Sequence, residues 1–327
     1  MKIGFIGLGN VGGKLAGSLI RNNQQVMVRD LDESLTQSFV DLGADCAPSP
    51  KKMMQACDMV ITCLPSPAAS REVVTGVDGL LNGISEGKIW LEMSTTDETE
   101  VKYLGDLVTQ RGGRPVDCPV SGGCHRADTG NISIFAGCDR DTFEIVLPTL
   151  TKMGRRVLHT GPLGSASILK VVTNYLATVN LVSCSEALMV AKLAGMDLNI
   201  AFEAIAISSG TSFVHETESQ VILNGSRDIS FTMDLVLKDI GLFQDIANRS
   251  GVKLELSPMI VEIFKDGIAR YGERELSPNI IRRLEDQVGS KVSAPGFPKE
   301  ILDHEPEIPG YEVIAQDRSE NGGVLNL

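Results

Sequence analysis

The sequence predicts an α/β domain built on a parallel sheet, followed by a long linking helix and an all-α C-terminal domain. Two observations predict this order. Short apolar runs of strand length alternate with helical patterns through the first half, and after about residue 170 apolar residues recur at three- and four-residue spacing. We expect domains over 1–162 and 163–290, with the linking helix over 163–195. The last part, 291–327, carries four prolines and many acidic residues, which predicts an irregular extension over the surface or a partner subunit.

The charge of the chain limits its partners. The chain has 327 residues and a formal net charge of −12. Such an acidic protein repels phosphate backbones and anionic lipid, so we expect neither nucleic acid nor a membrane as a partner. A small anionic substrate stays possible, because a local site can be positive inside a negative whole.

Two features concern the cellular compartment. We expect no apolar run of the roughly 20 residues that span a membrane, and no leader pattern precedes the first strand. The seven cysteines are odd in number and irregularly spaced, which favours reduced core residues over disulfides, reactive thiols or zinc ligands. The four histidines are scattered, and no metal site is expected. We therefore expect a cytoplasmic protein, with a mature form that has lost a transit peptide as the alternative.

The first motif is a glycine-rich turn between an apolar strand over 2–6 and a helical pattern over 14–21. The turn reads Gly7, Leu8, Gly9, Asn10, Val11, Gly12. In such a turn the first glycine permits the tight bend, the second lets a pyrophosphate approach the backbone, and the third lets the helix pack close to the strand. The helix then offers free N–H groups to the phosphates. The motif predicts a dinucleotide-binding Rossmann domain; without its strand and helix the pattern would indicate only a structural turn.

The end of the second strand indicates which dinucleotide binds. Asp30 follows an apolar strand over 25–29, about 20 residues beyond the glycines. A carboxylate there accepts hydrogen bonds from the adenosine ribose and repels a 2′-phosphate, so the sequence favours NAD over NADP. Arg29 argues the other way, because a guanidinium at this place could hold that phosphate. The alternative for Arg29 is a solvated charge at the strand end.

Two more strand ends are expected to line the cofactor. Apolar runs over 58–64 and 88–93 have strand length, and ligands of parallel sheets bind at the carboxyl ends of the strands. We assign four residues at these ends to the cofactor wall: Leu64, Pro65, Ser94 and Thr95. A helix N-cap is the alternative for the last two, since acidic residues follow them.

A further segment of small residues comprises Ser121, Gly122 and Gly123. It follows a strand-like entry that begins near Val116. Consecutive small residues expose backbone N–H groups, which suits an anion such as a carboxylate. The segment indicates an anion site, with an ordinary loop as the alternative.

Lys170 and Asn174 interrupt the apolar stretch of the linking helix. They are four residues apart and therefore share one helix face. Burying a lone ammonium is costly unless it has a partner or a task, and a buried lysine loses basicity, as a proton-accepting role requires. The alternative is a lysine whose stem crosses an apolar stripe and whose amine reaches solvent.

The chain resembles the 3-hydroxyacid dehydrogenase family over about residues 1–290. The resemblance depends on four segments that occur in this order: the glycine turn 7–12, the run 117–123, the helix start 164–174, and Lys238-Asp239. Any one of them could arise by chance, but the four together in this order are specific. The resemblance implies a Rossmann domain, a long interdomain helix and an all-helical domain that often forms dimers or tetramers.

The resemblance also implies roles for single residues. Lys170 matches the catalytic general acid/base, and Asn174 matches the asparagine that orients the substrate. The loop at Ser121–Gly123 matches the grip on the substrate carboxylate. Lys238 matches a lysine near the active site and the cofactor, and Asp30 matches the acid that marks NAD use.

Together these readings predict an oxidoreductase that transfers a hydride between NAD and a small 3-hydroxy acid or its semialdehyde, such as 3-hydroxyisobutyrate. A homodimer or homotetramer is expected. The alternatives are a reductase of tartronate, succinic or sulfonated semialdehyde, an imine reductase, and a non-catalytic NAD-binding protein. The matched lysine argues against the imine reductases, which commonly lack it.

Overall fold

The computed structural model describes residues 1–315, and the chain forms two compact units. Within the described residues the first unit comprises 1–122, 126–167 and 305–315; the second comprises 123–125 and 168–304. The sequence predicted the division between residues 162 and 163 and a separate extension from residue 291, whereas the units divide after residue 167 within helix 165–193, and the segment from Glu305 joins the first unit. Residues 316–327, the end of the expected extension, lie outside the described residues.

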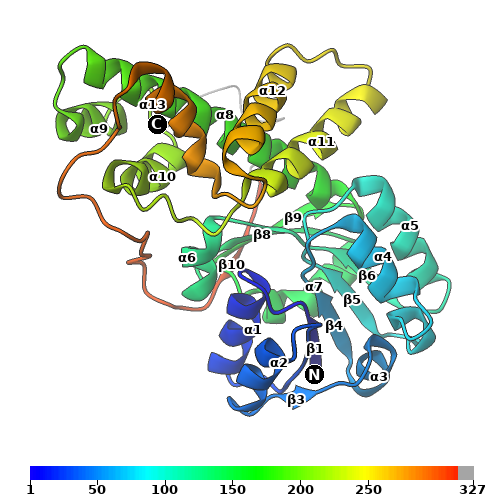
Figure 1. Cartoon of the computed structure of the whole chain (residues 1–327). Helices are drawn as coiled ribbons and strands as arrows, with labels where there is room; N and C mark the ends of the chain where they lie inside the picture. Colours follow the sequence, from blue (N-terminus) through cyan, green and yellow to red (C-terminus); the bar gives the residue numbers. More distant parts are fainter. Residues whose placement is uncertain (316–327) are drawn as a thin grey trace, which may run out of the picture. The chain divides into compact units, whose positions relative to one another are not determined.

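The first unit is built on a sheet that has ten strands within the described residues (Figure 1). The strands are β1 (Ile3–Ile6), β2 (Val26–Arg29), β3 (Asp45–Cys46), β4 (Met59–Thr62), β5 (Ile89–Glu92), β6 (Arg114–Asp117), β7 (Val120–Ser121), β8 (Ser133–Gly137), β9 (Arg156–Gly161) and β10 (Tyr311–Val313). Their order is β10-β9-β8-β6-β5-β4-β1-β2-β3, with β7 paired to β8. The pairing is parallel except where β8 meets β6 and β7. The predicted parallel sheet is confirmed.

Helices cover both faces of this sheet. They are α1 (Gly12–Arg21), α2 (Glu33–Val40), α3 (Pro50–Ala56), α4 (Pro67–Thr75), the short η1 (Leu80–Asn82), α5 (Glu98–Thr109), α6 (Gly123–Asp128) and α7 (Arg140–Leu150). Alternate strand residues enter two separate cores. Phe5 and Ile61 pack with α1, α2 and α7, whereas Val60 and Trp90 pack with α3, α4 and α5. Two covered faces explain why β1, β4 and β5 are buried throughout and read as continuous apolar runs.

The second unit is helical, as the sequence predicts. Its helices are α8 (Ser165–Leu193), whose first turn belongs to the first unit, α9 (Leu198–Ala206), α10 (Phe213–Asn224), α11 (Met233–Arg249), α12 (Leu256–Tyr271), η2 (Ser277–Ile281) and α13 (Arg282–Val288). Gly195 has a φ of +84° just beyond α8, so it ends the helix as a glycine in the left-handed region can. A buried ion pair joins Arg227 to Glu285 at 2.7 Å.

Helix α8 corrects the expectation that the chain has no apolar run long enough to span a membrane. By length and composition it could cross a membrane: its best 18-residue window has a mean hydropathy of 1.4, and 39% of that window is buried in the structure. Leu181, Leu188 and Met189 of α8 lie in the core of the second unit. Core helices of globular proteins pass the same test, so the finding is weak evidence for a membrane span.

The cysteines agree only partly with the core interpretation. None of the seven forms a disulfide within the part of the chain that the structure describes, and four of them are buried: Cys57, Cys118, Cys138 and Cys184. Cys46 is exposed, and Cys63 and Cys124 are partly exposed. Cys46 departs from the interpretation because β3, to which it belongs, is an edge strand of two exposed residues.

The C-terminal extension is more regular than expected. Its first part follows the second unit, where Val292 N–H donates to Glu285 Oε1 at 2.7 Å and Ala294 N–H donates to Leu223 O at 2.9 Å. Its later part adds β10 to the sheet, parallel to β9, with Tyr311 opposite Arg156. A strand of three residues shortly after Pro309 has too short a pattern to be read from the sequence.

Candidate active site

The glycine turn shows which of its glycines the fold itself requires. Gly7 has a φ of +95°, and a Cβ there would lie 2.2 Å from Cys63 O. A Cβ on Gly12 would lie 2.0 Å from Gly7 O. A Cβ on Gly9 would meet nothing within 4 Å. The fold therefore needs the outer two glycines, and the space over Gly9 is free for a ligand that approaches the backbone closely.

The start of α1 fits a phosphate. The other long helices of the first unit are capped by a side-chain oxygen at the N-cap residue: Asp32, Ser49, Ser66, Asp97 and Asp139. The N-cap residue of α1 is Val11, and no side chain caps this helix. Its first N–H groups, together with the positive end of the helix dipole, suit the pyrophosphate of a dinucleotide.

Asp30 and Arg29 at the end of β2 have different surroundings. The Asp30 carboxylate accepts hydrogen bonds from Leu8 N–H at 2.6 Å and Asp32 N–H at 2.9 Å, so it is joined to the glycine turn. The Arg29 guanidinium donates to Ala47 O at 3.2 Å and Pro48 O at 2.8 Å. These carbonyl contacts give Arg29 a structural role, which weakens the argument for a 2′-phosphate.

The ends of β4 and β5 are joined by a hydrogen bond between the predicted wall residues. Leu64 N–H donates to Ser94 Oγ at 2.7 Å, while Pro65 is exposed beside it. The N-cap alternative for Ser94 and Thr95 is wrong, because Asp97 caps α5. The predicted cofactor residues thus follow β1, β2, β4 and β5, which are neighbours in the sheet.

Sequence reasoning missed Glu92, which supports this wall. Glu92 is fully buried, and its Oε1 accepts hydrogen bonds from the Ser94 hydroxyl and from Ser94 N–H, the latter at 2.9 Å. Burial raises the pKa of Glu92, although the hydrogen bonds from Ser94 oppose that change. Glu92 follows apolar residues at the end of β5, and no local pattern in the sequence distinguished it from an ordinary charged residue at a strand end.

The second small-residue segment lies where β7 ends and α6 begins. Ser121 is the last residue of β7, and the next two residues have positive φ values, +130° at Gly122 and +86° at Gly123. Side chains rarely adopt such a backbone, so the loop depends on glycine at both places. The result is a turn of partly exposed backbone with no side-chain cap on α6, as an anion site would need.

The same segment begins with a buried acid that holds the start of α8. Asp117 accepts hydrogen bonds from Ser167 N–H at 2.8 Å and from the Ser167 hydroxyl at 2.7 Å. Burial raises the pKa of Asp117 to about 6, although both hydrogen bonds lower it. Ser167 stands three residues before Lys170, so Asp117 fixes the turn of α8 from which that lysine projects.

Lys170 is buried in a polar cluster of the second unit. The residue is only 8% exposed, and its Nζ donates a hydrogen bond to Asn174 Oδ1 at 2.8 Å. The pKa of Lys170 is lowered to about 8, chiefly by burial; the charge of Asp239 opposes this change, and the charge of Lys238 contributes to it. The alternative of a lysine that reaches solvent is therefore wrong. This amine can exchange a proton near neutral pH, as a general acid/base must.

Asp239 completes the cluster, and the predicted site residues did not include it. Asn174 Nδ2 donates to Asp239 Oδ2 at 2.5 Å, and Lys238 Nζ lies 3.1 Å from Asp239 Oδ1. Asp239 is 4% exposed. The signal was present in the Lys238-Asp239 pair, but a carboxylate beside a lysine on a helix usually reads as a solvated charge. Its two contacts orient Asn174 and offset the buried positive charge.

Two polar residues of the second unit, Ser212 and His125, have structural roles. The Ser212 hydroxyl caps α10 by accepting a hydrogen bond from His215 N–H at 3.0 Å. The His125 ring stacks on Phe213 with 6.3 Å between the ring centroids. The predicted site residues form two groups. The cofactor residues other than Lys238 belong to the first unit together with Ser121 and Gly122, whereas the second unit contains Gly123, Lys170, Asn174 and the predicted cofactor residue Lys238.

Comparison with known proteins also divides the chain into two segments, each of which matches a different family. Residues 2–161 match the family described as the NAD binding domain of 6-phosphogluconate dehydrogenase. Residues 164–284 match the family described as NAD-binding of NADP-dependent 3-hydroxyisobutyrate dehydrogenase. The predicted residues of the glycine turn and the cluster around Lys170 therefore each lie in a segment that matches an NAD-binding family.

Similar proteins span nearly the whole chain. The 2-(hydroxymethyl)glutarate dehydrogenase of Eubacterium barkeri is 31% identical over 90% of this chain and 98% of its own. The mitochondrial 3-hydroxyisobutyrate dehydrogenase of Rattus norvegicus is 30% identical over 84% of each chain. The structure titled Mycobacterium tuberculosis 3-hydroxyisobutyrate dehydrogenase with L-serine has a TM-score of 0.78 at 24% identity, over 86% of this chain and 98% of that one, and supports the fold. The chain belongs to the 3-hydroxyacid dehydrogenase family, whose members are NAD-linked oxidoreductases.

Proposed function

We propose that this protein transfers a hydride between NAD and a small 3-hydroxy acid resembling 3-hydroxyisobutyrate, with Lys170 as the general acid/base. The observation that carries the proposal is the buried Lys170 amine, whose pKa is lowered to about 8. A neutral amine accepts the hydroxyl proton as the carbon is oxidised, and its ammonium returns a proton to the oxygen when the semialdehyde is reduced. NAD, when bound, accepts or supplies the hydride.

The other residues position the reactants. The backbone of Ser121–Gly123 holds the substrate carboxylate, and Asn174 orients the hydroxyl toward Lys170. The glycine turn and α1 hold the pyrophosphate, and the ends of β4 and β5 line the cofactor, while Lys238 keeps the role near the cofactor that the family resemblance implies. Support for these roles comes from the uncapped start of α1, the open space over Gly9 and the contact between Lys170 and Asn174.

We expect the pH dependence of oxidation to follow Lys170. Below a pH of about 8 the amine is protonated, so kcat/KM for the hydroxy acid should fall about tenfold per pH unit. Asp239→Asn removes a charge that raises the pKa, so this limb should move to lower pH. Lys238→Met removes a charge that lowers the pKa, so the limb should move to higher pH. Steady-state pH profiles of the three proteins check this, and shifts in the same direction would contradict it.

The cofactor preference should depend on Asp30. Replacing Asp30 by alanine removes the acceptor for the ribose hydroxyls, which is worth about 1.5 kcal/mol or more, so kcat/KM for NAD should fall about tenfold. The variant also loses the contact with Leu8 N–H, which would affect both cofactors alike. The ratio of kcat/KM for NAD to that for NADP isolates the specific effect, and an unchanged ratio would exclude this role for Asp30.

A substrate panel tests the proposed function as a whole. We expect turnover with 3-hydroxyisobutyrate or a close 3-hydroxy acid, measured as NADH absorbance, with NAD preferred to NADP. Tartronate, succinic and sulfonated semialdehydes, assayed in the reducing direction, cover the alternative acids, and a cyclic imine covers the imine reductases. Binding of NADH without turnover of any of these would point to a non-catalytic NAD-binding protein.

We also propose a cytoplasmic homodimer or homotetramer. Apolar side chains on α8 are exposed in the single chain, among them Leu176 (54%), Val190 (67%) and Leu193 (57%). Exposed apolar surface of this kind is typical of subunit interfaces. Analytical ultracentrifugation of the intact chain tests the assembly, and a monomer at micromolar concentration would contradict it.

A further inference from the structure

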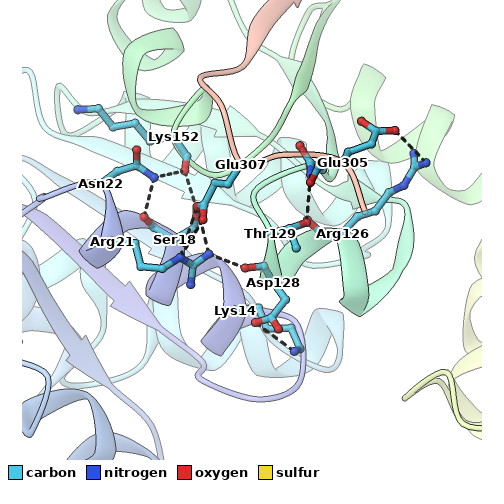
Figure 2. A network of polar contacts seen from close by, with 11 residues as sticks. Lys14, Ser18, Arg21, Asn22, Arg126, Asp128, Thr129, Lys152, Glu305 and Glu307 are labelled. Atoms are coloured by element: carbon cyan, nitrogen blue, oxygen red, sulfur yellow. Dashed lines mark hydrogen bonds and ion pairs between the residues drawn. The ribbon is translucent and has the colours of Figure 1, made fainter. Parts of the chain in front are cut away.

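Ion pairs and hydrogen bonds join the C-terminal segment 305–313 to the rest of the first unit (Figure 2). The matched families end at residue 284, so the segment lies beyond them. Arg155 donates to two backbone carbonyls of the segment, those of Ile308 and Pro309, and Gly310 N–H donates to Thr151 O at 2.8 Å. These contacts fix the course of the segment before it enters β10.

Glu307 joins this segment to α1, the helix that follows the glycine turn. Its Oε2 lies 3.2 Å from Arg21 Nε, and its Oε1 accepts a hydrogen bond from the Ser18 hydroxyl at 3.3 Å. A Cβ on Gly130 would lie 3.3 Å from the same Oε1, so glycine leaves room for the carboxylate. Glu307 therefore contacts the helix that is proposed to hold the pyrophosphate.

Glu305 joins the same segment to the end of α6. Its Oε1 lies 3.4 Å from Arg126 Nη2, and its backbone carbonyl accepts a hydrogen bond from Asn131 Nδ2 at 2.9 Å. Asn131 is fully buried, and its N–H donates to Arg126 O at 2.8 Å. The side chain and the backbone of Glu305 thus hold Arg126 and the loop that follows it.

Helices α6 and α1 also contact each other directly. Arg21, the residue that pairs with Glu307, donates to Asp128 O at 2.5 Å. The Asp128 carboxylate lies 3.3 Å from Lys14 Nζ. In the other direction, Arg126 reaches the loop at the start of α6, since a Cβ on Gly122 would lie only 3.3 Å from Arg126 Cδ. One continuous network therefore leads from the C-terminal segment through Arg126 to Gly122.

From this network we propose that Glu305 and Glu307 are positioning residues for substrate binding. They hold α6 against α1 and thereby fix the loop Ser121–Gly123 in the conformation that receives the substrate carboxylate. The inference rests on the proposed role of that loop. Exposed ion pairs are individually weak, but here they act together with a buried amide and a paired strand. A loop that is already ordered in the free protein does not have to be ordered at the expense of binding energy when the substrate binds.

The test compares two changes in the same segment. In Glu305→Ala/Glu307→Ala we expect KM for the acid to rise about fivefold, with kcat and the Kd of NADH within twofold of wild type. The matched control is Glu312→Ala. Glu312 belongs to β10 and forms an ion pair with Arg140 at 2.5 Å, not with α1 or α6. The control should keep the wild-type KM. An equal rise in both variants would reduce the segment to a general stabiliser and overturn the proposal.

A purely electrostatic effect and a positioning effect of the two acids predict opposite changes in KM, which sharpens the test. Removing two acids should strengthen the binding of an anion if their only effect is electrostatic, so a fall in KM would overturn the proposal. Arg126→Ala removes the other partner of the Glu305 contact, and we expect it to raise KM in the same direction as Glu305→Ala. If the alanine variants do not fold, Glu305→Gln/Glu307→Gln replaces them with the same expected direction.

A second readout does not depend on activity. Hydrogen exchange of the peptide 119–130 should become at least about fivefold faster in Glu305→Ala/Glu307→Ala and stay unchanged in Glu312→Ala. If the substrate panel shows no turnover but this exchange responds as expected, the proposed function fails and the positioning role stands. If turnover is present but neither KM nor exchange responds, the positioning role fails alone.

Discussion

Replacing Lys170 by alanine is expected to lower kcat at least about 100-fold while the Kd of NADH stays within twofold of wild type. The loss follows because the Lys170 amine is the group proposed to exchange the hydroxyl proton directly while Asn174 orients the substrate, and general acid/base catalysis contributes about 100-fold or more. NADH binding should persist because the glycine turn belongs to the other unit. Single-turnover absorbance and NADH fluorescence titrations measure the two quantities.

Lys170→Arg separates charge from proton transfer. Arginine keeps the positive charge but cannot become neutral in a protein, so it should lose turnover about as severely as alanine. Recovery of most of the activity in this variant would show that the site needs only a cation. Near-normal kcat in the alanine variant would remove Lys170 from the mechanism altogether.

Replacing Gly9 by alanine is expected to weaken NADH binding roughly 30-fold without destabilising the protein. A Cβ at Gly9 meets no protein atom within 4 Å, so the thermal midpoint should change by less than about 2 °C. The same methyl group would stand where the pyrophosphate must approach the backbone. Overpacking of this kind costs about 2 kcal/mol, which corresponds to the stated loss of affinity.

Gly12→Ala is the matched comparison in the same turn. Its Cβ would lie 2.0 Å from Gly7 O, so this variant should lower the thermal midpoint clearly, with or without ligand. Calorimetry and NADH titration of both variants separate a glycine needed by the fold from one needed by the ligand. Wild-type affinity in Gly9→Ala would place the dinucleotide elsewhere.

The fold could be predicted well because its signals are local. The strands β1, β4 and β5 are buried on both faces and therefore appear as apolar runs between glycine and helix signals. Gly195 marked the end of α8 for a similar reason, since its backbone needs a positive φ. The strand β10 could not be predicted, because it exists only through pairing with β9, about 150 residues earlier in the sequence.

The site was predictable where function imposes a short pattern, and not where support comes from distant residues. Lys170 and Asn174 are one helical turn apart, so their contact follows from spacing alone. Glu92, Asp239 and Glu305 act on residues that the fold brings to them, or through burial that no window of sequence reveals. The charges were visible, but their partners were not.

The most direct test of the account is the titration of the Lys170 side chain itself. Lysine labelled with carbon-13 and nitrogen-15 reports the charge of each amine by NMR, and the Lys170→Arg variant assigns the signal. The account predicts a midpoint at a pH of about 8 in the intact protein. A Lys170 amine that stays charged up to its ordinary pKa of 10.5 would contradict the central claim that this lysine is prepared to exchange a proton during hydride transfer.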